Sequence, residues 1–294
     1  MDRYASLKST QENGRVSTQR KQRELTEVDH HSYLFEADIH SLLSYSSPSS
    51  LCLFCFPYAG GGASVYRQWV VDVPSEIHVV PIQLPGRENR LREDPYHQLQ
   101  PLIQDLAWNL NPFLDRPFAF FGHSMGALLC FELARELRRK GMRLPLALFV
   151  SGRRAPHLRS TKPLLHPLPN REFVHEVQRF QGTPEEIWEN EELVEILLPI
   201  LRADFSLCET YLYREEPPFA FPIYALSGRD DPHVNEHEIR EWGKQTQGQF
   251  HSYYFPGNHF YLHSCRRDIL RTIQDELRNP FIDRIPHQIG RAHV

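Results

Sequence analysis

The pentapeptide that begins at Gly122 reads GHSMG and fits the G-x-S-x-G pattern around a nucleophilic serine. An apolar run, Phe118 to Phe121, precedes it and a segment with helical spacing follows, which gives the strand, turn and helix that the pattern needs. The flanking glycines permit a tight turn that projects the hydroxyl outward, and the N-terminus of the following helix favours developing negative charge. Ser124 is therefore the candidate nucleophile.

A serine hydroxyl is a weak nucleophile at neutral pH, so it needs a neighbouring base that an acid holds in the right tautomer. Asp231 follows an expected strand at Ile223 to Leu226, and His259 follows another at Phe250 to Phe255. Both side chains would then stand at C-terminal strand ends, in the chain order serine, aspartate, histidine that α/β-hydrolases use. We expect Ser124, Asp231 and His259 to form a catalytic triad.

Single residues of this set have other interpretations. Asp230 adjoins Asp231 on the same turn, and spacing alone does not separate the two carboxylates, although we favour Asp231. Taken alone, Asp231 could be a turn aspartate and His259 a surface histidine, whereas three such residues at successive strand ends argue against coincidence. His123 would point away from the serine on a sharp turn, so we assign it to packing.

An oxyanion hole should combine two backbone N–H groups, one from Met125 directly after the nucleophile and one from the loop after the first core strand. That loop runs from Phe56 to Gly62 and reads FPYAGGG, whose glycines let backbone amides approach a substrate carbonyl. We choose Ala59 as the second donor. A phosphate-cradling loop is the competing interpretation, but the Gly-Lys-Ser ending of a P-loop is missing.

Short apolar runs alternate with longer amphipathic segments, which is the pattern of βα units that build a mostly parallel sheet with helices on both faces. The clearest helix is expected at Ala127 to Lys140, with Gly141 as its cap. We predict an α/β-hydrolase fold with an inserted helical lid. The expected strands are Leu51 to Phe56, Ile77 to Ile82, Phe118 to Phe121, Leu146 to Val150, Ile223 to Leu226 and Phe250 to Phe255.

The lid is expected at about residues 156–216, because the interval between the fourth and fifth strands is too long for a simple crossover. Arg171 to Phe180 and Glu191 to Tyr213 are its helix-like segments. Its apolar residues either line a substrate site or pack the lid onto the core, and packing is the favoured interpretation for each. These residues are Phe173, Val177, Phe180, Trp188 and Phe205.

The two ends of the chain carry little structural signal. Residues 1–45 are polar and without sustained periodicity, so we expect a poorly ordered extension. The catalytic domain is expected at 46–280. Residues 281–294 are predicted to be an unstructured tail, and their ending, IGRAHV, is similar to translated sequencing-adapter sequence.

Composition narrows the classes of partner and the cellular compartment that the protein can have. A net charge of −4 leaves no broad basic field for nucleic acid. No apolar run of about 18 residues and no signal-peptide core occur, so we expect a cytoplasmic protein that does not bind membranes. The 5 cysteines are too few for a disulfide framework, and Cys52 and Cys55 lie in LCLFCF, which favours a buried strand over a zinc site.

Several motifs in order give the chain a resemblance to type II thioesterases, the stand-alone editing enzymes of nonribosomal peptide and polyketide synthesis, and to medium-chain acyl-carrier thioesterases. The resemblance runs from about Leu51 to Leu262. It rests on GHSMG, on FPYAGGGAS with Trp69, on LPGRE at Leu84 to Glu88, on LPILRADF at Leu198 to Phe205, and on PGNHFYL at Pro256 to Leu262.

The resemblance implies hydrolysis of an acyl or aminoacyl thioester from the phosphopantetheine arm of a separate acyl or peptidyl carrier protein. It gives the triad and the oxyanion donors the roles stated above, with no cofactor or metal, and we expect a monomer. Exposed basic residues such as Arg87, Arg90 or Arg92 are candidates for docking an acidic carrier, although a solvated loop is the favoured interpretation for each. A general carboxylesterase or lipase with the same triad and a noncatalytic carrier-binding protein are the alternatives.

Overall fold

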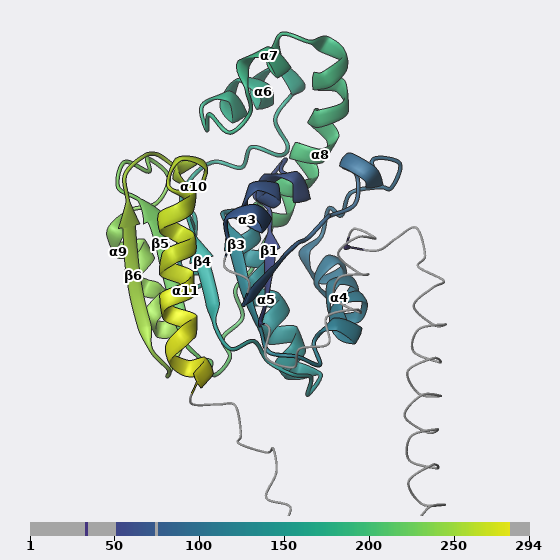
Figure 1. Ribbon diagram of the computed structural model, residues 1–294. Helices are drawn as coiled ribbons and strands as arrows, with labels where there is room; N and C mark the ends of the chain where they lie inside the picture. The colour runs from purple at the N-terminus through teal and green to yellow at the C-terminus, as the bar shows by residue number, and fades with distance from the viewer. Residues whose placement is uncertain (1–32, 35–50, 74–75, 283–294) are drawn as a thin grey trace, which may run out of the picture. The chain divides into compact units, whose positions relative to one another are not determined.

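The computed structural model describes residues 33–34, 51–73 and 76–282, and its centre is a parallel sheet. The described strands follow the order β2-β1-β3-β4-β5-β6, and every neighbouring pair is parallel (Figure 1). Their bounds are β1 Leu51–Phe56, β2 Ile77–Pro81, β3 Phe118–His123, β4 Leu148–Ser151, β5 Ile223–Gly228 and β6 Phe250–Phe255. The α/β-hydrolase prediction is confirmed, and strand ends differ from it by at most two residues.

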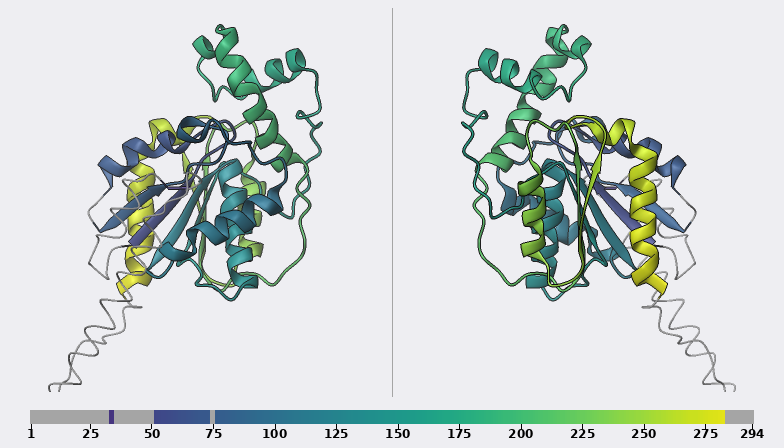
Figure 2. Two further views of the ribbon diagram at one scale, coloured as in Figure 1. Left: turned by 90° about the vertical axis from the view of Figure 1, so that its right-hand side faces the viewer. Right: turned by 90° about the vertical axis from the view of Figure 1, so that its left-hand side faces the viewer.

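Helices cover both faces of this sheet (Figure 2). Helices α3 (Arg67–Asp72) and α11 (Arg266–Ile282) pack on one face, where Trp69, Ile269 and Ile273 join the apolar core. Helices α4 (Leu99–Leu110) and α5 (Met125–Arg139) contact each other on the opposite face. The shorter helices α9 (Glu236–Arg240) and α10 (Tyr261–Ser264) follow β5 and β6 along the chain.

Helix α5 begins and ends where the sequence requires. Its leucines 129, 133 and 137 recur at a spacing of four and are buried on the sheet. The helix ends at Arg139, and Gly141, two residues later, has a φ of +64°, the left-handed conformation that favours glycine. The N–H groups of Gly141 and Met142 donate to the carbonyls of Arg138 and Leu137, at 3.1 and 2.9 Å. The predicted cap is therefore confirmed as a Schellman motif.

Three helices occupy the interval between β4 and β5: α6 (Asn170–Gln178), α7 (Glu185–Trp188) and α8 (Glu191–Glu209). They lie beyond the C-terminal ends of the strands, the edge at which Ser124 also stands (Figures 1 and 2). The side chain of Asn190 caps α8 by accepting from Leu193 N–H. The limits 156–216 for the lid remain a prediction.

The predicted extension 1–45 and tail 281–294 lie outside the described residues, apart from Tyr33, Leu34 and the last two residues of α11, Phe281 and Ile282. Tyr33 is buried, donates from its hydroxyl to Asp105 at 2.6 Å and lies under the guanidinium of Arg90. Cys52 and Cys55 are buried on β1. Among the described helices, none combines the length and apolar character that crossing a membrane requires.

Candidate active site

Ser124 stands on a sharp turn between β3 and α5. Its φ of 53° and ψ of −109° are a conformation that non-glycine residues rarely adopt. Both glycines of the motif are required by close backbone approach. A Cβ on Gly122 would lie 2.1 Å from the carbonyl oxygen of Gly126, and a Cβ on Gly126 would lie 2.1 Å from that of Phe56. The turn therefore holds the serine at the C-terminal edge of the sheet, as the elbow pattern predicts.

His259 and Asp231 meet in the loops that follow β6 and β5. The Nδ1 atom of His259 lies 2.7 Å from Oδ2 of Asp231, and the two side chains are 5% and 0% exposed. The other oxygen, Oδ1, accepts from His233 N–H at 2.8 Å. Asp230 is exposed, and its backbone N–H donates to the carbonyl of Gly257. The geometry thus pairs His259 with Asp231 and leaves Asp230 in solvent.

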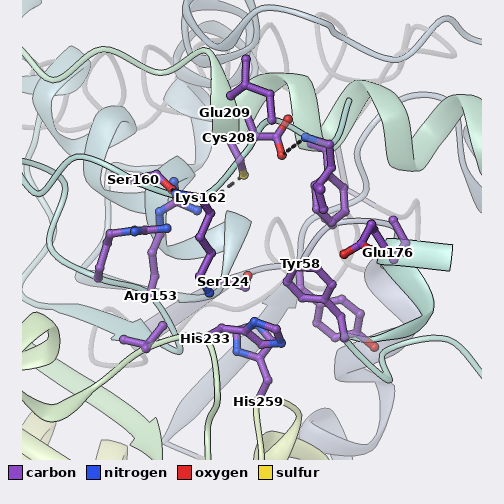
Figure 3. Close-up of a pocket in the computed structure, with 18 of the residues that line it drawn as sticks. Tyr58, Ser124, Arg153, Ser160, Lys162, Glu176, Cys208, Glu209, His233 and His259 are labelled. Atoms are coloured by element: carbon purple, nitrogen blue, oxygen red, sulfur yellow. Dashed lines mark hydrogen bonds between the residues drawn. The ribbon is translucent and has the colours of Figure 1, made fainter. Parts of the chain in front are cut away.

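Ser124 and His259 line the same cavity, whose volume is about 1850 Å³ (Figure 3). Common small-ligand pockets occupy about 300–1,000 Å³, so this cavity has room for an extended substrate. Among the apolar residues singled out in the lid, Val177, Phe180 and Phe205 line it. Phe173 is fully buried, and it shares the apolar cluster of the lid with Val177 and with the partly buried Trp188 and Phe205. Packing therefore describes Phe173, Trp188, Val177 and Phe205, and the last two also line the cavity.

The loop after β1 directs its N–H groups in different directions. Gly60 N–H donates to Oδ2 of Asp204 at 2.8 Å, and Gly61 N–H donates to the carbonyl of Tyr58 at 2.9 Å. Ala59 lines the cavity, and its N–H has no acceptor among the described residues. Ala59 N–H is thus available to a ligand in the cavity, whereas those of Gly60 and Gly61 are engaged.

His123 is fully buried beneath the site. Its Nδ1 lies 2.8 Å from Ser151 Oγ, which lies 2.6 Å from the hydroxyl of Tyr261. Burial holds the pKa of His123 well below its usual value, and the neighbouring His259 lowers it further. A neutral, enclosed ring bonded to Ser151 agrees with the packing role expected for it.

Sequence reasoning missed His233. Its ring stacks on Phe180 at a centroid distance of 4.1 Å and an interplanar angle of 12°, and its centroid lies 5.3 Å from that of His259. Burial first, and then the nearby His259, lowers the pKa of His233 to about 4. It therefore connects a residue of the lid to the base. Its place two residues after Asp231 was the only signal in the sequence.

The expectation that Arg87 and Arg90 are exposed is wrong. Arg87 is 5% exposed and pairs with Asp204, and Arg90 is 4% exposed and pairs with Glu93 at 2.6 Å. Their guanidinium groups bond to carboxylates and backbone carbonyls of this chain, so they do not face a partner. Arg92 remains exposed.

The sequence from residue 52 to residue 277 matches the family described as Thioesterase domain. The chain belongs to the thioesterase family. This thioesterase is 44% identical over 233 residues to the gramicidin S biosynthesis protein GrsT of Aneurinibacillus migulanus, which covers 79% of this chain and 91% of that protein. It is 32% identical over 222 residues to the medium-chain S-acyl fatty acid synthase thioesterase of Rattus norvegicus, covering 74% and 84%.

Solved structures agree with this assignment. The type II thioesterase BorB from the borrelidin biosynthetic cluster is 40% identical, with a TM-score of 0.72 over 79% of this chain and 94% of that one. ClbQ from the colibactin NRPS/PKS pathway is 30% identical, with a TM-score of 0.76 over 80% and 99%. The predicted resemblance is confirmed, and the protein is a thioesterase.

Proposed function

We propose that this thioesterase hydrolyses acyl or aminoacyl groups from the phosphopantetheine arm of carrier proteins, in editing or product release, with an acyl-enzyme intermediate on Ser124. The observation that carries the proposal is that Ser124 and His259 line one large cavity, with His259 bonded to a buried Asp231. Relatives named for peptide and polyketide pathways support the choice of a carrier-bound substrate.

In the first half-reaction, Ser124 Oγ attacks the thioester carbonyl carbon while His259 Nε2 takes the hydroxyl proton. Asp231 holds the opposite nitrogen of the ring as an N–H donor and stabilises the imidazolium. The carbonyl oxygen becomes an oxyanion, to which Ala59 and Met125 donate their backbone N–H groups. The C–S bond then breaks, and the departing sulfur takes the proton from His259.

In the second half-reaction, water attacks the acyl-serine ester. His259 takes a proton from the water and returns one to Ser124 Oγ as the ester bond breaks, which releases the acid. The same two N–H groups stabilise this second oxyanion. Every step uses groups of the chain and the substrate, and no cofactor enters the scheme.

The cavity suits the acyl part of such a substrate. Val177, Phe180 and Phe205 provide apolar surface from the lid, and Ser124 lines the same cavity. An apolar wall removes acyl methylenes from water, which stabilises the bound acyl chain by about 0.8 kcal/mol for each CH₂ group.

All five cysteines are free thiols, the state expected in a reducing compartment, which supports a cytoplasmic location.

The test is kcat/KM for one acyl group presented on holo-carrier protein, on coenzyme A, on a simple thiol and as an oxygen ester. We expect the carrier thioester to be the best substrate, because binding remote from the carbonyl positions the thioester in the site. Equal values on all three thiols would remove the carrier assignment. A preference for the oxygen ester would favour a general esterase instead.

A further inference from the structure

Two sequence motifs that the chemistry leaves unused meet in a buried ion pair. Arg87, from LPGRE, donates through Nη1 and Nη2 to the two oxygens of Asp204, from LPILRADF, at 2.7 and 2.8 Å. The side chains are 5% and 1% exposed. Such a bidentate pair fixes both partners in orientation as well as in position.

Both partners also hold the loop after β1. Asp204 Oδ2 accepts from Gly60 N–H at 2.8 Å, and Arg87 Nη1 donates to the carbonyl of Gly61 at 3.0 Å. Helix α8, which carries Asp204, packs directly on the loop, because a Cβ on Gly60 would lie 2.6 Å from Leu201 Cδ2. One helix of the lid therefore both covers Gly60 and takes its N–H.

The loop from Tyr58 to Gly61 is a tight turn, and its geometry sets the orientation of the Ala59 N–H. Gly61 N–H donates to the carbonyl of Tyr58, and Gly60 has a φ of +78°, the value that the third residue of a type II turn requires. The carbonyl of Tyr58 and the N–H of Ala59 belong to one planar peptide group. Any shift of residues 60 and 61 therefore turns the Ala59 N–H as well.

We propose that Asp204 and Arg87 are positioning residues of this thioesterase, which hold the turn from Tyr58 to Gly61 so that Ala59 N–H points at the oxyanion. The proposal rests on the proposed function, in which Ala59 is an oxyanion donor. Helix α8, which carries Asp204, then helps to position the oxyanion donor. Arg87 and Asp204 touch the turn and act on the reacting atoms only through it.

Three variants separate positioning from simple structural support. Asp204→Asn keeps the shape of the side chain and weakens the pairing with Arg87. The double variant Arg87→Met with Asp204→Val replaces the pair by apolar side chains, a change that buried ion pairs often tolerate without loss of stability. Asp72→Asn is the matched control, since Asp72 accepts from Arg266 Nε at 2.6 Å between α3 and α11, away from the turn.

The assay is hydrolysis of an acyl-carrier thioester, with kcat expressed per active serine titrated by a fluorophosphonate and with thermal unfolding recorded in parallel. Loss of one oxyanion donor costs about 10²–10³ in kcat, so a misaligned donor should cost about 10–100-fold. We expect that loss in both Asp204 variants, with KM changed less than about threefold and Asp72→Asn unaffected. Affinity for a boronic acid, whose adduct on Ser124 is tetrahedral, should fall by a similar factor.

Wild-type kcat in the stable double variant would overturn the proposal, because the pair would then serve only packing. A loss confined to KM would also overturn it. If the double variant does not fold, Asp204→Asn decides alone through its kcat and its boronic acid affinity. These outcomes presuppose that the wild-type chain hydrolyses the thioester, and absence of that activity would contradict the proposed function itself.

Discussion

Replacing Asp231 by asparagine should remove most of the activity, because the site uses both carboxylate oxygens as acceptors. Oδ2 lies 2.7 Å from His259 Nδ1, and Oδ1 accepts from His233 N–H at 2.8 Å. An asparagine has only one acceptor oxygen. If that oxygen faces His233 N–H, the amide NH₂ faces His259 Nδ1 and favours the tautomer protonated on Nε2. That tautomer cannot take the proton of Ser124.

The opposite amide orientation does not restore the wild-type hydrogen bonds. It places the NH₂ group against His233 N–H, two donors facing each other where the Asp231 side chain is 0% exposed, and this costs about 1–3 kcal/mol. In a well-studied serine protease the corresponding change lowers kcat about 10⁴-fold. We therefore expect Asp231→Asn to lower kcat by about 10³–10⁴, or about 4–5.5 kcal/mol of transition-state stabilisation at 1.36 kcal/mol per factor of ten.

The matched control is Asp230→Asn, because Asp230 is exposed on the same turn and only its backbone bonds to Gly257. The assay is kcat at saturating acyl-carrier substrate, normalised to correctly folded protein by circular dichroism. Asp230→Asn should stay within about threefold of wild type. Equal small losses in the two variants, or more than a tenth of wild-type kcat in Asp231→Asn, would refute the reasoning.

Three further predictions follow from the lid and the charges around it. The pKa of His233 is lowered to about 4, so its protonation favours the unfolded chain. The free energy of unfolding, measured with urea, should therefore fall between about pH 6.5 and pH 4, and it should fall less steeply in His233→Asn. Equal pH dependence in the two proteins would contradict this. Amide hydrogens of α6 should exchange faster than those of α5 and slow when an acyl carrier binds, whereas uniform protection would argue against a mobile lid. Arg92→Ala should weaken the preference for an acidic carrier at low salt and not at high salt, and a salt-independent change would exclude electrostatic docking.

Local patterns were enough to predict the sheet and the elbow. Strand runs such as Leu51 to Phe56 are apolar and short, and Gly141, two residues after α5, has the conformation that only glycine adopts easily. GHSMG predicted the turn because Gly122 and Gly126 must lie against other backbone atoms, a constraint that shows directly in sequence. The loops after β5 and β6 follow strands, so the meeting of Asp231 and His259 was also foreseeable.

Side-chain pairing between distant segments was not predictable from one sequence. Arg87 and Arg90 occur in a polar stretch that is typical of a solvated loop. Both are nevertheless buried, because Asp204 and Glu93 form ion pairs with them. Asp204 pairs with Arg87 from 117 positions further along the chain. The stacking of His233 on Phe180 likewise depends on how the lid sits over the sheet, which no local pattern encodes.

The central claim is that Ser124 performs thioester cleavage on a carrier-bound acyl group. Its most direct test is intact-mass spectrometry of an acyl-loaded carrier protein incubated with the wild-type chain and with Ser124→Ala. The account predicts that wild type returns the carrier to its holo form by loss of the acyl mass, and that Ser124→Ala leaves nearly all of it acylated, since loss of the nucleophile removes most of the rate enhancement. Conversion by Ser124→Ala at even half the wild-type rate would contradict the account.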